Sequence, residues 1–76
     1  MEIKILGKGC PRCHALQDAA RKATENLGIE ATFEEVKDPA DIVSYGIMST
    51  PGLVVDGKVV SAGRVLTADE IEDILA

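Results

Sequence analysis

Hydrophobic and polar residues alternate at the start of the chain. Within Glu2–Leu6, Ile3 and Ile5 fall on one side of an extended backbone, and this period of two is typical of a short β-strand with one buried face. Gly7 and Gly9 then break the alternation. The opening pattern therefore predicts a strand that ends in a glycine-containing turn.

The pattern changes to the period of an amphipathic helix from about Pro11, and Gly28 is a good stop for that helix. Its apolar stripe consists of Leu16, Ala19, Ala20, Ala23 and Leu27. Alternation returns from Ile29 to Glu34, which predicts a second strand with one buried face, at an edge of the sheet.

A short helix is predicted next, because Asp38 can cap it, Pro39 suits its first position and Gly46 can end it. Two apolar runs, Leu53–Val55 and Lys58–Val60, then flank Asp-Gly, the strongest short-range signal for a two-residue hairpin turn. These runs are therefore expected to form an antiparallel pair.

The last segment reads as a helix that begins with a capping box formed by Thr67 and Glu70. Its expected buried side consists of Leu66, Ile71, Ile74 and Leu75. The complete order is β-α-β-α-β-β-α in a single domain spanning residues 1–76. The first strand, helix and second strand imply a right-handed parallel unit, which the hairpin extends, with helices on both faces.

The composition of the chain excludes several classes of protein and partner. The net charge of −5 argues against nucleic acid and anionic membrane surfaces as partners, because both select clustered Lys and Arg. No apolar stretch has the length of a membrane-spanning helix or resembles the core of a signal peptide, so the cytoplasm is the expected compartment. Two cysteines in a reducing compartment are more typical of catalysis or metal binding than of a structural disulfide.

The cysteines form Cys10-Pro-Arg-Cys13, between the first strand and the first helix. At a helix start, unpaired N–H groups and the helix dipole stabilise the Cys10 thiolate, and Lys8 and Arg12 add positive charge. Cys13 lies nearly one turn later and is expected to be the more buried thiol, while Pro11 suits a helical first turn. This arrangement predicts dithiol–disulfide exchange in which Cys10 attacks and Cys13 resolves.

Three alternatives to dithiol–disulfide exchange are compatible with the same residues. A haem site would use Cys10, Cys13 and His14, with Met48 as a possible second axial ligand, but aromatic residues to surround a haem are scarce. A thiolate site for a metal or an iron–sulfur cluster lacks ligands within one chain but could be shared between two subunits. The cysteines could also be inert and buried. Met48 is otherwise expected in the core or near the site.

The CxxC motif, together with Ser49-Thr50-Pro51 and the following Asp-Gly hairpin, resembles the thioredoxin superfamily over essentially the whole chain. The chain looks like a glutaredoxin in length and is most similar to the small proteins of the redox-active disulfide protein 2 family. That resemblance implies a three-layer α/β/α fold with a four-stranded mixed sheet in the order 2-1-3-4. It also implies a cis peptide bond between Thr50 and Pro51.

The family's nucleophile corresponds to Cys10, its resolving thiol to Cys13 and its substrate-contacting backbone to Thr50, with Pro51 beside the cysteines. The expected partners are protein disulfides and a reductase or thiol donor, for a monomer that needs no cofactor or metal. The sequence departs from the thioredoxin pattern at Lys4, where thioredoxins have a buried acid, and at Gly9, where they have an aromatic residue.

Overall fold

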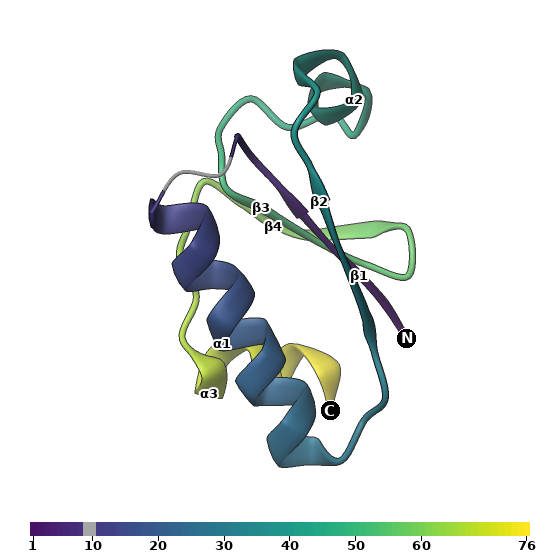
Figure 1. Ribbon diagram of the computed structural model, residues 1–76, viewed down its shortest axis with the longest axis vertical. Helices are drawn as coiled ribbons and strands as arrows, with labels where there is room; N and C mark the ends of the chain where they lie inside the picture. Colours follow the sequence, from purple (N-terminus) through teal and green to yellow (C-terminus); the bar gives the residue numbers. More distant parts are fainter. Residues whose placement is uncertain (9–10) are drawn as a thin grey trace.

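The helices and strands of the computed structural model, which describes residues 1–8 and 11–76, follow one another in the predicted order (Figure 1). They are β1 (Glu2–Leu6), α1 (Pro11–Leu27), β2 (Thr32–Val36), α2 (Pro39–Ser44), β3 (Gly52–Val55), β4 (Lys58–Ala62) and α3 (Ala68–Leu75). Each strand and helix expected from the hydrophobic pattern is therefore present.

The four strands form one mixed sheet in the order β2-β1-β3-β4, as predicted. β1 runs parallel to β2, with Ile3 opposite Phe33, and antiparallel to β3, with Ile5 opposite Leu53. β3 and β4 are antiparallel, with a register irregularity at Leu53 and Val54. Strand β2 lies at an edge of the sheet, which confirms its expected position.

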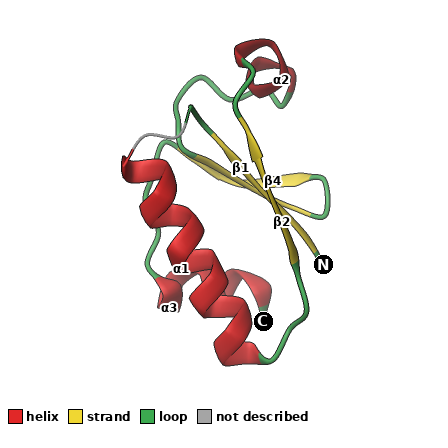
Figure 2. Ribbon diagram, viewed as in Figure 1, coloured by secondary structure: helices red, strands yellow, loops and turns green. Residues whose placement is uncertain are grey.

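Helices cover both faces of the sheet, which gives the predicted three layers (Figure 2). α1 and α3 pack on one face around a core that includes Ile3, Ile5 and Ile71. α2 packs on the other face, where a smaller core includes Leu6 and Ile42. Because successive strand residues point to opposite faces, β1 contributes side chains to both cores. The larger core extends to the first turn of α1, where it includes Cys13.

Three details of the predicted strands and helices are wrong. Leu27, expected on the apolar stripe of α1, is 37% exposed as the last residue of that helix. The second strand was expected over residues 29–34 but spans Thr32–Val36, because the chain must first leave α1 through Gly28, whose φ is 68°, before it can pair with β1. Ile74 is 41% exposed, because the buried stripe of α3 runs through Ile71 and Leu75 and leaves Ile74 to one side of it.

Local signals for turns and caps are confirmed. Asp38 accepts a hydrogen bond from the Ala40 N–H at 2.9 Å, and Thr67 and Glu70 form the capping box. The Thr67 backbone N–H, which donates to the Glu70 carboxylate, is the main cause of a lowered pKa for that carboxyl group. Asp56 and Gly57 both have positive φ, as a two-residue hairpin turn requires.

Candidate active site

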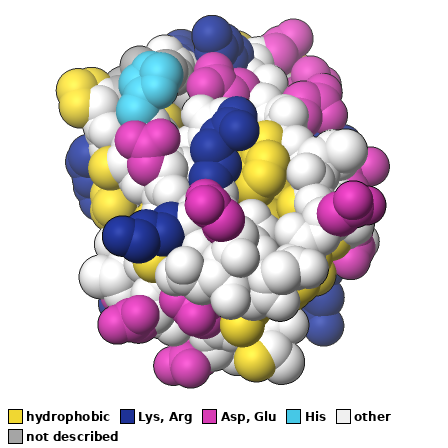
Figure 3. All heavy atoms as spheres, turned by 60° about the horizontal axis from the view of Figure 1, so that its bottom comes forward, with side chains coloured by type: hydrophobic (Ala, Val, Ile, Leu, Met, Phe, Trp, Pro, Cys, Tyr) yellow, Lys and Arg dark blue, Asp and Glu magenta, His cyan; other side chains and the backbone are white. Residues whose placement is uncertain are grey.

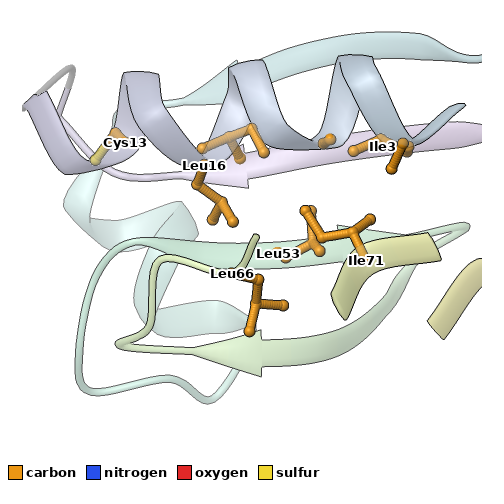
Figure 4. Packing of buried hydrophobic residues seen from close by; sticks show 9 residues of the cluster. Ile3, Cys13, Leu16, Leu53, Leu66 and Ile71 are labelled. Carbon is orange, nitrogen blue, oxygen red and sulfur yellow. The ribbon is translucent and has the colours of Figure 1, made fainter. Parts of the chain in front are cut away.

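Cys13 is buried on the first turn of α1 and is 5% exposed. Figure 4 shows its side chain on the same side of α1 as Leu16, at one end of the row of core side chains. The expectation that this thiol is shielded is confirmed. Cys10, the expected nucleophile, and Gly9 lie outside the described residues, so the prediction for Cys10 rests on its place immediately before α1.

Gly7, the residue after β1, packs directly against Cys13. A Cβ atom added at Gly7 would overlap the Cys13 sulfur and would lie 3.5 Å from the Cys13 Cβ and 3.9 Å from the Thr50 Cβ. The end of β1, the first turn of α1 and the segment before β3 therefore meet at one point. Only a residue without a side chain allows the buried sulfur this close to the strand.

Thr50 and Pro51 lie at this meeting point and differ in exposure. Thr50 is exposed, whereas Pro51 is fully buried, and the peptide bond between them is cis, as expected from the resemblance. The Pro51 carbonyl accepts a hydrogen bond from the Gly63 N–H at 2.9 Å. The structure thus brings Thr50 beside Cys13 with its side chain open to solvent.

Arg12 reaches across the site to the segment after β4. Its Nη2 donates a hydrogen bond to the Gly63 carbonyl at 3.1 Å, although the two residues are 51 positions apart in the chain. Gly63 has a φ of 77°, and a Cβ added there would come within 2.9 Å of the Ser49 Cβ. Arg12 was expected to act as a nearby charge, and the structure shows that its guanidinium also makes a specific contact.

An apolar groove of about 490 Å³ begins at Thr50 and extends along α2. Its lining residues are Lys8, Pro39, Ile42, Val43, Ile47, Met48 and Thr50. Val43 is 68% exposed and Met48 is fully exposed, so the expectation of a core position for Met48 is wrong and its expected place near the site is right. Met48 belongs to neither core, whereas its neighbour Ile47 in the same connection between α2 and β3 packs into the smaller core.

The charged and polar residues of the site are exposed. Lys8 is exposed at the rim of the apolar groove, and within residues 1–8 and 11–76 no acidic group pairs with it. Pro11 is exposed as the first residue of α1, and no acidic side chain lies on that first turn. The positive end of the α1 dipole is therefore not neutralised by the helix's own residues.

Lys4 occupies a different environment, on the sheet face that α2 covers in part. Its Nζ donates to the Tyr45 hydroxyl at 3.3 Å and lies 3.5 Å from Glu2 and 3.8 Å from Glu34. The hydrogen bond to Tyr45 is the largest cause of the raised pKa of Lys4, ahead of the attraction of the two carboxylates. Lys4 therefore stays protonated at neutral pH and is not positioned to act as a proton acceptor.

Acidic and basic side chains are interspersed on the face shown in Figure 3, and hydrophobic side chains appear between them in small groups. Among residues 1–8 and 11–76, no group of three or more His, Cys, Asp or Glu side chains is arranged to hold a metal ion. Over the same residues, none of the helices has both the length and the apolar character needed to cross a bilayer.

Besides the hydrogen bond between Arg12 and Gly63, sequence reasoning missed the packing of Gly7 and the apolar groove. Gly7 was interpreted only as a strand breaker, although its position three residues before the CxxC motif is a signal for close backbone packing. The apolar groove was not expected, because its residues come from α2 and from the segment after it. The position of Val43 and Met48 outside any strand was no signal by itself, because their neighbours Ile42 and Ile47 are equally apolar and are buried.

The similarity to known proteins extends over all or nearly all of the chain. A family model described as thioredoxin domain matches residues 1–76. A protein named thioredoxin from Methanothermobacter thermautotrophicus is 43% identical over 76 residues, which is 100% of this chain and 99% of the relative. A second thioredoxin, from Methanocaldococcus jannaschii, is 36% identical over 73 residues, which is 96% of this chain and 84% of the relative.

Proposed function

Because this chain belongs to the thioredoxin domain family and is a thioredoxin-like redox protein, we propose that it exchanges a Cys10–Cys13 dithiol with disulfides of client proteins. The observation that carries this proposal is the placement of Cys13, buried on the first turn of α1 against Gly7 and beside Thr50. A shielded thiol on the first turn of a helix is suited to attack a mixed disulfide that has formed on a cysteine at the start of that helix.

Cys10 acts first in the proposed reaction. It immediately precedes Pro11, the first residue of α1, where the helix dipole and the nearby charge of Lys8 favour its thiolate. The thiolate attacks one sulfur of the client disulfide, a new S–S bond forms between Cys10 and the client, and the client's other sulfur leaves as a thiolate that takes up a proton.

Cys13 acts second. Its thiol loses a proton, and the resulting thiolate attacks the Cys10 sulfur of the mixed disulfide. The bond between Cys10 and the client breaks, the Cys10–Cys13 disulfide forms, and the client leaves with both of its sulfurs reduced. Two electrons have then passed to the client, and a reductase or thiol donor must restore the dithiol. The reverse sequence oxidises a client dithiol.

Client docking is assigned to Thr50, Pro51 and the apolar groove. Thr50 is exposed at the start of the segment leading into β3, so its backbone can pair with an extended client strand, while buried Pro51 holds that segment in the fold. The apolar groove begins at Thr50 and can take an apolar client side chain next to the disulfide. Lys8 at its rim favours an acidic residue in the same client segment.

Replacing Met48 by Lys should weaken client docking, because it removes a fully exposed apolar side chain from the apolar groove and adds a charge there. We expect KM for insulin, used as a protein disulfide with dithiothreitol as the electron source, to rise about five- to tenfold. The rate with hydroxyethyl disulfide, which is too small to fill the apolar groove, should stay unchanged.

The matched control is Ile74→Lys, which places the same charge at an exposed apolar residue of α3, on the other face of the sheet. That variant should reduce insulin with an unaltered KM. Equal KM values for the Met48 and Ile74 variants would show that the apolar groove does not bind the client.

A redox titration of the purified protein tests the proposed function directly. Equilibration with glutathione and thioredoxin couples of defined potential should show a single two-electron transition that both cysteines report. We expect a colourless, metal-free monomer made of one domain over residues 1–76, and a dithiol of this kind is suited to the reducing cytoplasm. Stoichiometric metal or an iron–sulfur chromophore, with no reversible thiol loss, would instead establish a thiolate metal-binding module.

A further inference from the structure

The hydrogen bond between Arg12 and Gly63 joins two parts of the candidate site that are far apart in the chain. Arg12 is the second residue of α1 and lies within the CxxC motif, whereas Gly63 directly follows β4. The guanidinium donates to the Gly63 carbonyl at 3.1 Å, so the first turn of α1 is tied to the segment between β4 and α3. A guanidinium hydrogen bond of this length is charge-assisted and directional.

Gly63 is in turn tied to the client-docking segment. Its N–H donates to the Pro51 carbonyl at 2.9 Å. Its α-carbon also packs against Ser49, and a Cβ added to Gly63 would lie 2.9 Å from the Ser49 Cβ. The two hydrogen bonds use the N–H and the C=O of the same residue. They form a continuous connection from Arg12 through Gly63 to Pro51.

We propose that Arg12 is a positioning residue: through Gly63, it fixes the position of the first turn of α1, which carries Cys13, relative to the Thr50–Pro51 segment. This inference rests on the proposed function and deepens it. A client strand paired at Thr50 presents its disulfide at one place, and the attacking sulfur must lie in line with that S–S bond. Because the first turn of α1 and the docking segment are both bonded to Gly63, the distance between the helix start and the docked client is fixed.

This role differs from that of a charge which only stabilises the Cys10 thiolate. A charge effect would alter the reaction with every disulfide, because it changes the thiolate itself. A positioning effect is confined to clients that dock at Thr50, because a small disulfide diffuses to the thiolate without using that segment. The ratio of the two rates therefore separates the two roles.

The experiment compares the full-length wild-type protein with Arg12→Met, Arg12→Lys and Lys22→Met. Rates are measured with insulin and with hydroxyethyl disulfide, with dithiothreitol as the electron source, and the Cys10 thiolate is titrated by its ultraviolet absorbance. Lys22 is exposed on the same helix, so Lys22→Met removes an equal charge without touching Gly63. Arg12→Lys keeps the positive charge and a group that can donate a hydrogen bond, but loses the planar guanidinium.

Arg12→Met should lower kcat/KM for insulin about three- to tenfold, the range expected for loss of one hydrogen bond, and should change the hydroxyethyl disulfide rate less than about twofold. The thiolate titration should be unchanged, Arg12→Lys should recover part of the insulin rate, and Lys22→Met should match the wild type. A parallel loss with both substrates and a shifted thiolate titration would overturn the positioning role in favour of a charge effect. Equal insulin rates for Arg12→Met and Lys22→Met would also overturn it.

Failure of the proposed function gives a different result. A wild-type protein inert toward both disulfides overturns the oxidoreductase proposal and the role of Arg12 with it. An active wild type with the same substrate ratio in all variants overturns only the role of Arg12.

Discussion

Cys13→Ser should accumulate mixed disulfides with client proteins. Cys10 can still attack a client disulfide in this variant, but no second thiol resolves the product, so turnover is lost and the covalent adduct persists. The buried position of Cys13 strengthens this expectation, because little solvent or external thiol reaches the place from which resolution occurs. The measurement is a non-reducing gel of the variant after incubation with insulin, followed by mass spectrometry of the adduct.

The matched control is Cys10→Ser, which should form no adduct because the buried Cys13 is a poor primary nucleophile. Equal trapping by the two variants would contradict the assignment of nucleophile and resolving thiol. Trapping by Cys10→Ser alone would reverse the two roles.

Gly7→Ala should destabilise the fold and disturb Cys13 at the same time. The added methyl group would overlap the Cys13 sulfur, and it would also lie 3.5 Å from the Cys13 Cβ, so β1 or α1 must shift to make room. Overpacking of this kind in a core costs about 1–3 kcal/mol, a large part of the stability of a small domain. We expect a lower midpoint in urea unfolding and a slower release of client from the mixed disulfide.

Gly57→Ala separates these two effects. Gly57 has open space around its α-carbon but a φ of 81°, so an alanine there strains the hairpin turn by roughly 1–2 kcal/mol without contact with the site. This variant should be destabilised with an unaltered rate of mixed-disulfide resolution. A Gly7→Ala variant with the urea midpoint and resolution rate of the wild type would refute the tight packing of Gly7 on Cys13.

Local features of the fold were predictable because their causes lie within a few residues. Asp56-Gly57 produces its turn through backbone conformations available to that pair, and Thr67 caps α3 through Glu70, three positions away. The start of β2 was not predictable from the same pattern. Ile29 continues the alternation in sequence, but the strand begins only at Thr32, where the chain comes beside β1 after the end of α1.

Some features of the candidate site were likewise predictable from the sequence, and others were not. The CxxC spacing at a helix start predicted that Cys13 would be shielded, because a residue three positions into an amphipathic helix can lie on its buried stripe. The contact between Gly7 and Cys13 could not be predicted, since it depends on how closely α1 packs against the end of β1. Met48 was ambiguous for a similar reason, because hydrophobicity alone does not decide whether a loop residue reaches a core.

By itself, the sequence determined the order of strands and helices, the hairpin, the helix caps and the place of Cys13 on the first turn of α1, because hydrophobic period and short-range hydrogen bonding specify these features. Only the tertiary structure decided that Arg12 reaches Gly63 and that the apolar groove adjoins Thr50. The hydrogen bond joins residues 51 positions apart, and the apolar groove brings Lys8 into one lining with Thr50 and α2. They arise from the strand order and pairing, which bring the end of β1, the start of β3 and the end of β4 to the same end of the sheet, where side chains distant in the chain become neighbours.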